Sequence, residues 1–133
     1  DMLRPAQTPD VMPNFKWWGI ESRTEGALIG TCGYCRWDRQ HGRAEIGYDL
    51  WPKYWGQGLM PEALQALLHY GYQEMGLNRV EATTHTENLR SQRVLEKLGF
   101  QREGILREYY RRDGAYSNQV AFSLLRREWS ESP

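Results

Sequence analysis

The sequence lacks any excess of charge, since 17 Lys and Arg side chains balance 17 Asp and Glu side chains. Proteins whose main role is to bind nucleic acid or an anionic membrane usually carry a net positive charge. The sequence also contains no apolar run long enough to span a bilayer and no visible secretory leader. These absences argue against nucleic acid and membrane as partners, and they predict a soluble, cytoplasmic protein.

Cysteine is scarce, and the two cysteines, Cys32 and Cys35, have the C-x-x-C spacing of a redox pair or of half a zinc site. A structural zinc site needs two further ligands, and none of the three histidines lies at a paired spacing. The motif falls in a β-like run, where residues three apart point to opposite faces. We therefore predict packed free thiols and no metal site.

The two most common nucleotide-binding signatures are also absent. Gly56 and Gly58 lie just ahead of a helical pattern that Pro61 opens. No Lys-Ser or Lys-Thr follows the glycines, and Pro61 stands where the dinucleotide motif has its third glycine. Amides at the start of a helix, next to permissive glycines, can nevertheless hold an anion. From the residues alone, an anion-binding loop and a plain structural turn are equally good explanations.

What the sequence does contain is an alternation of strand and helix patterns in 133 residues, which suits a single domain, 1–133. Residues 1–14, which hold three prolines, are expected to form an irregular arm. We predict strands at Lys16 to Ser22, Ala27 to Trp37, Arg43 to Trp51, Arg79 to His85, Gln101 to Tyr110 and Tyr116 to Leu125, and helices at Pro61 to Met75 and Asn88 to Leu98. This order predicts a mixed α/β fold, with the strands on either side of the first helix parallel.

Polar residues gather beside the glycine loop in this predicted order. Glu45 lies on one face of a cleanly alternating strand that ends just before the loop. Asn88 and Ser91 are three apart at the start of the second helix, so they share a face. Asn88 as an ordinary helix cap is the simpler explanation. A glycine loop and two polar side chains converging on one cleft favour a binding site.

Two stretches carry a family resemblance. They are WGQGLMPEA at 55–63, and N-x-x-S at 88–91 followed by VLEKLGF at 94–100. The chain, from about Gly30 to Trp129, resembles the GNAT superfamily of acetyl-CoA-dependent N-acetyltransferases. It is most similar to the RimJ/RimL branch of ribosomal-protein N-terminal alanine acetyltransferases. The resemblance implies a central mixed twisted sheet flanked by helices. It also implies that a strand and one or two helices that normally come first are missing before Asp1.

The resemblance assigns a binding role to the loop and to its neighbours. The pyrophosphate of acetyl-CoA would be held by backbone amides of the loop, and the strand end and Asn88 would hold the pantetheine arm. The cofactor-binding residues implied in this way are Leu50, Trp51, Gln57, Gly58, Leu59, Met60, Pro61, Glu62, Asn88 and Ser91. No metal is implied.

The resemblance also implies two catalytic residues. Glu45 would accept the proton of the amine, often through water, and Ser91 would stabilise the leaving thiolate. Many relatives have a tyrosine acid where this chain has Leu95, so Ser91 would take that part. Gly47, on the Glu45 face, would leave room for a substrate. The alternative for Glu45 is a solvated strand residue that pairs with a nearby arginine.

The resulting hypothesis is an N-acetyltransferase that moves an acetyl group from acetyl-CoA to a primary amine. The favoured acceptor is a protein or peptide N-terminus, and a small amine such as a polyamine or an aminoglycoside stays open. A catalytically silent coenzyme A-binding module is the alternative of another class, and a homodimer is compatible with either.

Overall fold

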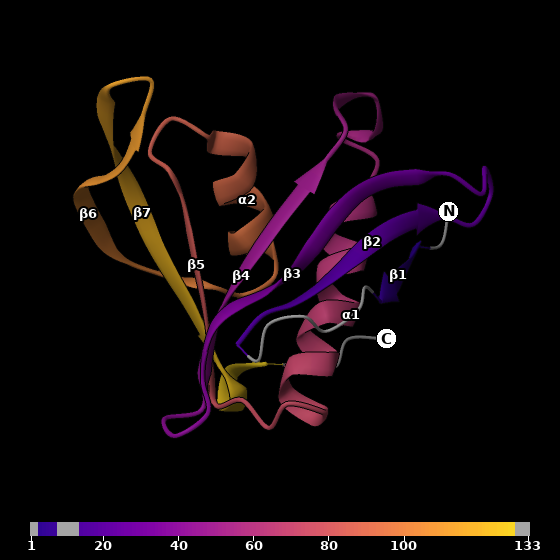
Figure 1. Cartoon of the computed structure of the whole chain (residues 1–133), viewed down its shortest axis with the longest axis horizontal. Helices are drawn as coiled ribbons and strands as arrows, with labels where there is room; N and C mark the ends of the chain where they lie inside the picture. Colours follow the sequence, from indigo (N-terminus) through magenta and orange to yellow (C-terminus); the bar gives the residue numbers. More distant parts are fainter. Residues whose placement is uncertain (1–2, 8–13, 130–133) are drawn as a thin grey trace.

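The computed structural model describes residues 3–7 and 14–129. Its strands are β1 (Leu3–Gln7), β2 (Lys16–Ser22), β3 (Leu28–Asp38), β4 (Arg43–Leu50), β5 (Arg79–His85), β6 (Gln101–Arg112) and β7 (Ala115–Leu125). Its α-helices are α1 (Leu59–Gln73) and α2 (Leu89–Lys97), and two short 3₁₀ turns, Pro52–Tyr54 and Arg126–Glu128, follow β4 and β7. The described strands form one seven-stranded sheet in the order β1-β2-β3-β4-β5-β7-β6 (Figure 1). The six strands and two helices predicted from the sequence are confirmed, with ends that differ by one or two residues.

One pair of strands in this sheet is parallel and the others are antiparallel. The parallel pair is β4 and β5, as the helical crossover through α1 predicts. Their pairing runs only from Arg43–Arg79 to Glu45–Glu81. Beyond that point β4 stays paired with β3 and β5 with β7, so the two halves of the sheet separate. Figure 1 shows β4 and β5 diverging toward the end where α2 lies.

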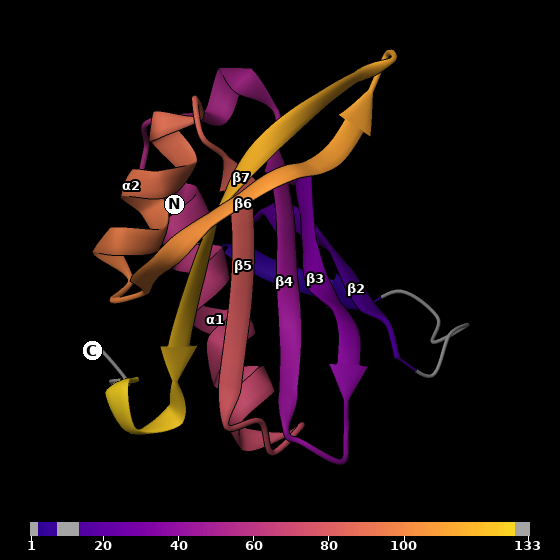
Figure 2. The ribbon, with the colours of Figure 1, turned by 90° about the vertical axis from the view of Figure 1, so that its left-hand side faces the viewer.

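The core lies between the sheet and the helices, which Figure 2 shows on one side of the strands. The inward face of α1 repeats apolar residues at three and four, and Leu64, Leu67 and Leu68 are almost fully buried. Each such side chain contributes about 1.5–3 kcal/mol by leaving water. Two buried phenols fix the position of α1: Tyr34 on β3 donates to the Leu67 carbonyl at 2.7 Å, and Tyr72 donates to the Leu124 carbonyl of β7 at 2.6 Å.

The expectation of an irregular arm is wrong for Leu3–Gln7, which form β1 and pair with β2. Pro5 misled the prediction, because proline cannot donate to a central ladder. β1 is an edge strand, where proline is tolerated. The rest of the predicted arm, 1–2 and 8–13, lies outside the described residues. The first helix begins at Leu59 and not at Pro61. A proline in the third position is acceptable, because the first four amides of a helix have no internal acceptor.

The two cysteines are free thiols on β3, as predicted. Cys32 belongs to the core, where burial raises the pKa of its thiol to about 12 and makes it unreactive at neutral pH. Cys35 is half-buried. Among the described residues, no helix has the length and apolarity needed to cross a membrane.

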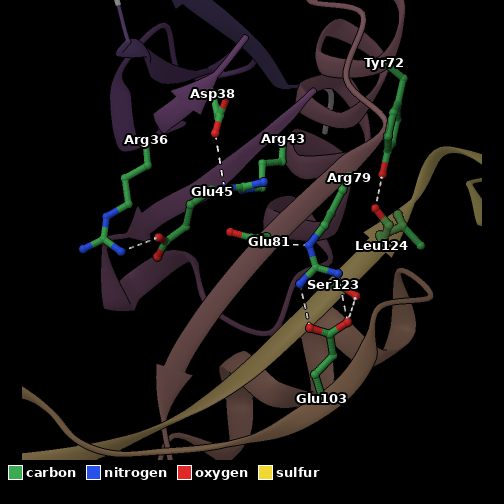
Figure 3. Close-up of polar contacts among 10 residues, drawn as sticks. All are labelled: Arg36, Asp38, Arg43, Glu45, Tyr72, Arg79, Glu81, Glu103, Ser123 and Leu124. Atoms are coloured by element: carbon green, nitrogen blue, oxygen red, sulfur yellow. Dashed lines mark hydrogen bonds and ion pairs between the residues drawn. The ribbon is translucent and has the colours of Figure 1, made fainter. Parts of the chain in front are cut away.

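An ion-pair network ties together the three strands on one side of the divergence (Figure 3). The Arg79 guanidinium on β5 donates two hydrogen bonds to the Glu103 carboxylate on β6, a bidentate ion pair with distances of 2.6 and 3.0 Å. It also donates to Glu81 at 2.8 Å. Ser123 on β7 donates to Glu103 at 2.7 Å. The hydrogen bonds from Arg79 and Ser123 lower the pKa of Glu103 to about 2.

Glu103→Gln is expected to lower the free energy of unfolding at neutral pH by about 0.5–1 kcal/mol, a small value because Glu103 is 41% exposed and solvent screens the pair. The folded-state pKa lies below the ordinary value of 4.5. The stabilisation is therefore present above pH about 4.5 and is lost as the pH falls toward about 2. Urea denaturation across this range should show the wild type and the variant converging in acid. Glu96→Gln, an exposed carboxylate on α2, is the matched control, and equal losses in both variants would contradict the prediction.

Candidate active site

The divergence of β4 and β5 opens a cleft of about 830 Å³. Its walls come from the separated parts of the two strands, from the loop before α1 and from the first turns of α2. The charges around it are unevenly placed. Glu45 and Asp49 line the β4 side, whereas Arg90, Arg93 and Lys97 line the α2 side. The cleft therefore offers cations to an anionic ligand on one wall and carboxylates to a cationic ligand on the other.

The glycine loop ends this cleft with unused hydrogen-bond donors. Gly56 and Gly58 have φ values of 75° and 76°, which side chains rarely adopt, and Gly58 is the N-cap of α1. Within the described residues, the backbone N–H groups of Gly56, Gln57, Gly58, Leu59 and Met60 have no acceptor in the chain. The helix dipole adds partial positive charge at the same point. These amides are therefore available to an anion, although free first amides are a general property of helices, so both explanations of the loop stay open.

The structure brings together most of the residues that the sequence singles out. The cleft is lined by Glu45, Leu50, Gly58, Leu59, Met60, Pro61, Asn88 and Ser91. Three others, Trp51, Gln57 and Glu62, lie outside its lining. The amide of Trp51 donates to the Ile29 carbonyl at 2.9 Å, and the ring is 51% exposed. The Gln57 side chain donates to the Lys53 carbonyl at 3.2 Å, and the Gln57 backbone amide has no acceptor among the described residues.

Glu45 is a buried carboxylate at the point where the strands part. It is 8% exposed, and it receives a hydrogen bond from Thr83 of β5 at 3.4 Å. Burial raises its pKa above the ordinary 4.5, the Arg36 charge and the Thr83 hydrogen bond oppose that rise, and Glu81 adds to it. A carboxylate with a raised pKa is a stronger base than an ordinary glutamate, which suits it to accept a proton. The expected alternative, a solvated residue, does not fit this burial.

The arginine expected to pair with Glu45 in that alternative is present in the structure. Arg36 has a nitrogen 3.6 Å from Glu45, and Figure 3 shows its guanidinium directed at the carboxylate. Arg36 lies in a bulge of β3, with φ of 53°, directly after the residue that pairs with Glu45. The same guanidinium donates to Tyr109 on β6 at 2.8 Å. Arg36 therefore links β4 and β6, which lie in different halves of the sheet.

On the opposite wall, Asn88 and Ser91 hold each other in place. The Asn88 side chain accepts the Ser91 amide at 3.1 Å and caps α2, which is the simpler of the two roles expected for it. The Ser91 hydroxyl lies 2.5 Å from the hydroxyl of Tyr48 on β4. Leu95 is fully buried in the core. Sequence reasoning missed Tyr48, because an alternating strand pattern marks it only as an apolar inward residue.

A second contact missed from the sequence joins the loop to both walls. The Trp55 indole N–H donates to the Leu50 carbonyl at 2.7 Å, and the Arg90 guanidinium lies 3.6 Å from the centre of the Trp55 ring. A stacked arginine of this kind is stabilised by the ring quadrupole. The spacing of Arg90, Arg93 and Lys97, at three and four along α2, could have indicated a basic face.

The expected space over Gly47 is partly filled. A side chain at Gly47 would meet the Trp17 ring at 2.8 Å. The missing side chain therefore accommodates Trp17, which stacks on Phe15. Gly47 also lines the cleft, so the expectation that it leaves room for a substrate stays a prediction.

Comparison with known proteins gives this geometry a family. Residues 2–101, more than half of the chain, match the model of the acetyltransferase (GNAT) domain. The chain belongs to the GNAT acetyltransferase family. The fold described above is thus that of a GNAT domain, and the resemblance inferred from the two sequence stretches is confirmed.

Among GNAT relatives, the uncharacterized N-acetyltransferase p20 of Bacillus licheniformis is 47% identical over 103 residues, 77% of this chain and 58% of that protein. The ribosomal protein uS5-alanine N-acetyltransferase of Escherichia coli is 30% identical over 115 residues, 86% of this chain and 59% of that protein. The crystal structure of the ribosomal-protein-S5-alanine acetyltransferase of Vibrio fischeri has a TM-score of 0.81 at 26% identity, covering 87% of this chain and 64% of that one. The chain thus spans less than two thirds of these relatives.

We expect the free energy of unfolding of Glu45→Gln, relative to that of the wild type, to increase as the pH rises above about 4.5. Because the folded-state pKa of Glu45 is raised, the folded wild type keeps a proton that the unfolded chain releases. Wild-type stability therefore falls between 4.5 and the raised pKa, and Gln removes this fall while keeping an acceptor for Thr83. Urea denaturation over pH about 4 to 8 measures it.

Arg36→Gln should change the pH dependence of stability in the opposite direction from Glu45→Gln. The Arg36 charge lowers the pKa of Glu45, so its removal should extend the fall in stability to higher pH. Parallel pH profiles for the wild type and Glu45→Gln would show that this carboxylate is not perturbed.

Proposed function

We propose that the protein is an N-acetyltransferase that transfers the acetyl group of acetyl-CoA to a primary amine, with a protein or peptide N-terminus as the acceptor. The observation that carries this proposal is the run of unused amides from Gly56 to Met60, which opens onto the same cleft as the buried carboxylate of Glu45. Family membership supports it, because the relatives named above are N-acetyltransferases.

The donors of the cleft fit coenzyme A. Its pyrophosphate suits the bare amides of Gln57, Gly58, Leu59 and Met60 and the positive end of α1. Pro61 has no N–H to offer, and the Glu62 amide already donates to the Gly58 carbonyl at 3.4 Å, so neither contributes an amide. Arg90, Arg93 and Lys97 add positive charge along the α2 wall. Leu50 and Asn88 line the path between this loop and Ser91.

When bound, acetyl-CoA supplies an acetyl group that is already activated as a thioester. The residues of the chain then have two tasks. Glu45 Oε accepts the proton that an ammonium must lose before its nitrogen can attack, and its raised pKa suits this task. The Ser91 hydroxyl holds a proton on the opposite wall, where the leaving sulfur is expected. Holding both reactants in one cleft accounts for much of the expected rate.

Two relatives favour an N-terminal acceptor. The Escherichia coli and Vibrio fischeri proteins are named as acetyltransferases of a ribosomal-protein alanine. A short peptide N-terminus carries one positive charge, which the carboxylates of Glu45 and Asp49 on the β4 wall can attract. We therefore propose an N-terminal alanine as the first acceptor to test.

A thiol-release assay tests the proposal directly. Purified protein is given acetyl-CoA and peptides that begin with alanine, alongside N-terminally blocked copies of the same peptides and small polyamines. We expect release of coenzyme A only with free N-termini, together with an acetyl mass increase on the peptide. Turnover with polyamines alone would overturn the acceptor class. Tight coenzyme A binding without any turnover would favour the silent binding module.

Gly58→Asp is expected to weaken coenzyme A binding by about 100-fold or more, because it places a negative charge beside the bare amides. Isothermal calorimetry with coenzyme A measures the affinity. Among the described residues, no atom lies within 4 Å of the point that a Cβ would occupy at this position, so a steric collapse of the loop is not expected.

Two controls separate charge from strain. Gly58→Ala adds strain of about 1 kcal/mol at a positive φ but no charge, and its affinity should stay within about threefold of wild type. Gly114→Asp introduces the same residue at a φ of 78° in the turn between β6 and β7, and it should leave binding unchanged. Equal affinities for Gly58→Asp and Gly58→Ala would remove the loop from the binding site.

A further inference from the structure

The pair of hydroxyl groups formed by Tyr48 and Ser91 is not explained by packing alone. Tyr48 lies on β4 and Ser91 on α2, 43 positions apart in the chain, and their oxygens are 2.5 Å apart. Both residues are half-buried and both line the cleft. Two other buried phenols, Tyr34 and Tyr72, donate to backbone carbonyls and tie α1 to the sheet, and Tyr54 donates to the exposed Glu25 side chain at 2.9 Å. Tyr48 instead meets a side chain that lines the cleft.

The direction of this hydrogen bond follows from acidity. A phenol is a stronger acid than an aliphatic alcohol, so the favoured arrangement has Tyr48 donating and the Ser91 oxygen accepting. Burial raises the pKa of Tyr48 above its ordinary value, and the contact with Ser91 opposes that rise in part. The phenol therefore keeps its proton at neutral pH and remains a donor.

The Ser91 proton is then left to point into the cleft. The described residues offer its hydroxyl no partner besides Tyr48. Its backbone is fixed by the Asn88 cap at 3.1 Å, which limits the rotation of the side chain around the N-terminus of α2. Because the Ser91 oxygen accepts from Tyr48 and the Ser91 backbone is held by Asn88, the hydroxyl hydrogen of Ser91 is directed away from Tyr48.

We propose that Tyr48 is a positioning residue: its hydroxyl donates to Ser91 Oγ and thereby aims the Ser91 proton at the sulfur of coenzyme A. This inference rests on the proposed function, because it needs that sulfur in the cleft. No covalent bond changes in the step, and the proton stays on Ser91 while the thiolate is stabilised by the hydrogen bond. Ser91 touches the ligand, and Tyr48 acts through Ser91.

The pKa of the bound thiol of coenzyme A tests the proposal without any acceptor. A hydroxyl aimed at sulfur stabilises the thiolate and should lower the thiol pKa by about 1 relative to free coenzyme A. The thiolate is followed by its ultraviolet absorbance in complexes with coenzyme A, and complexes with desulfo-coenzyme A serve as the blank that subtracts tyrosine ionisation. The proteins are the wild type, Ser91→Ala, Tyr48→Phe and the double variant.

We expect Ser91→Ala to raise the thiol pKa to that of free coenzyme A. Tyr48→Phe should raise it by most of the same amount. The double variant should match Ser91→Ala, because Tyr48 acts only through Ser91. Tyr48→Phe keeps the ring, and thermal denaturation checks that the fold is retained. Tyr116→Phe, a phenol on β7 with its side chain exposed, is the matched control and should leave the thiol pKa unchanged.

Three results would overturn the proposal. The first is a thiol pKa in Tyr48→Phe equal to that in the wild type. The second is a thiol pKa in Ser91→Ala equal to that in the wild type. The third is a double variant whose change in thiol pKa equals the sum of the two single changes. Failure of the proposed function has a different signature: the expected pattern of thiol pKa values, with no thiol release in the presence of any amine, overturns the transferase alone. A wild type that does not bind coenzyme A overturns both.

Discussion

The early end of the β4–β5 pairing is the constraint on which the rest of the structure depends. The ladder between these two parallel strands stops at Glu45–Glu81. Each strand keeps its other neighbour, β3 or β7, so the sheet opens without losing its remaining ladders. The opening places a carboxylate at its apex and exposes strand edges that would otherwise be covered. The cleft is therefore made by backbone topology, and side chains only line it.

The site keeps a buried acid in an arrangement that costs stability. Among the described residues, the Arg36 charge and the Thr83 hydroxyl oppose the rise in the pKa of Glu45. Gly56 and Gly58, by contrast, adopt a positive φ without strain because they have no side chain, and the amides beside them have no acceptor in the described chain. Perturbed ionisable groups such as Glu45 often mark functional sites. The ion pairs around Arg79 and the phenols that anchor α1 lie on the elements beside the cleft and hold its walls in place.

Much of the fold could be predicted because it depends on local periodicity. The alternation in Arg43–Leu50 and the three-and-four repeat of α1 each bury one face, so they specify their elements without reference to the rest of the chain. The strand at Leu3–Gln7 could not be predicted in this way. Its identity comes from pairing with β2, and its proline is acceptable only because β1 lies at the edge of the described sheet.

By itself the sequence determined which faces of its strands and helices had to be buried, because burial patterns are set by a residue and its near neighbours. It also determined the family, through two short stretches. Only the tertiary structure decided that Arg36 faces Glu45, that Arg90 stacks on Trp55 and that Tyr48 meets Ser91. These contacts join different elements. They depend on strand register, on a bulge in β3 and on how far β4 and β5 diverge, none of which is encoded in local spacing.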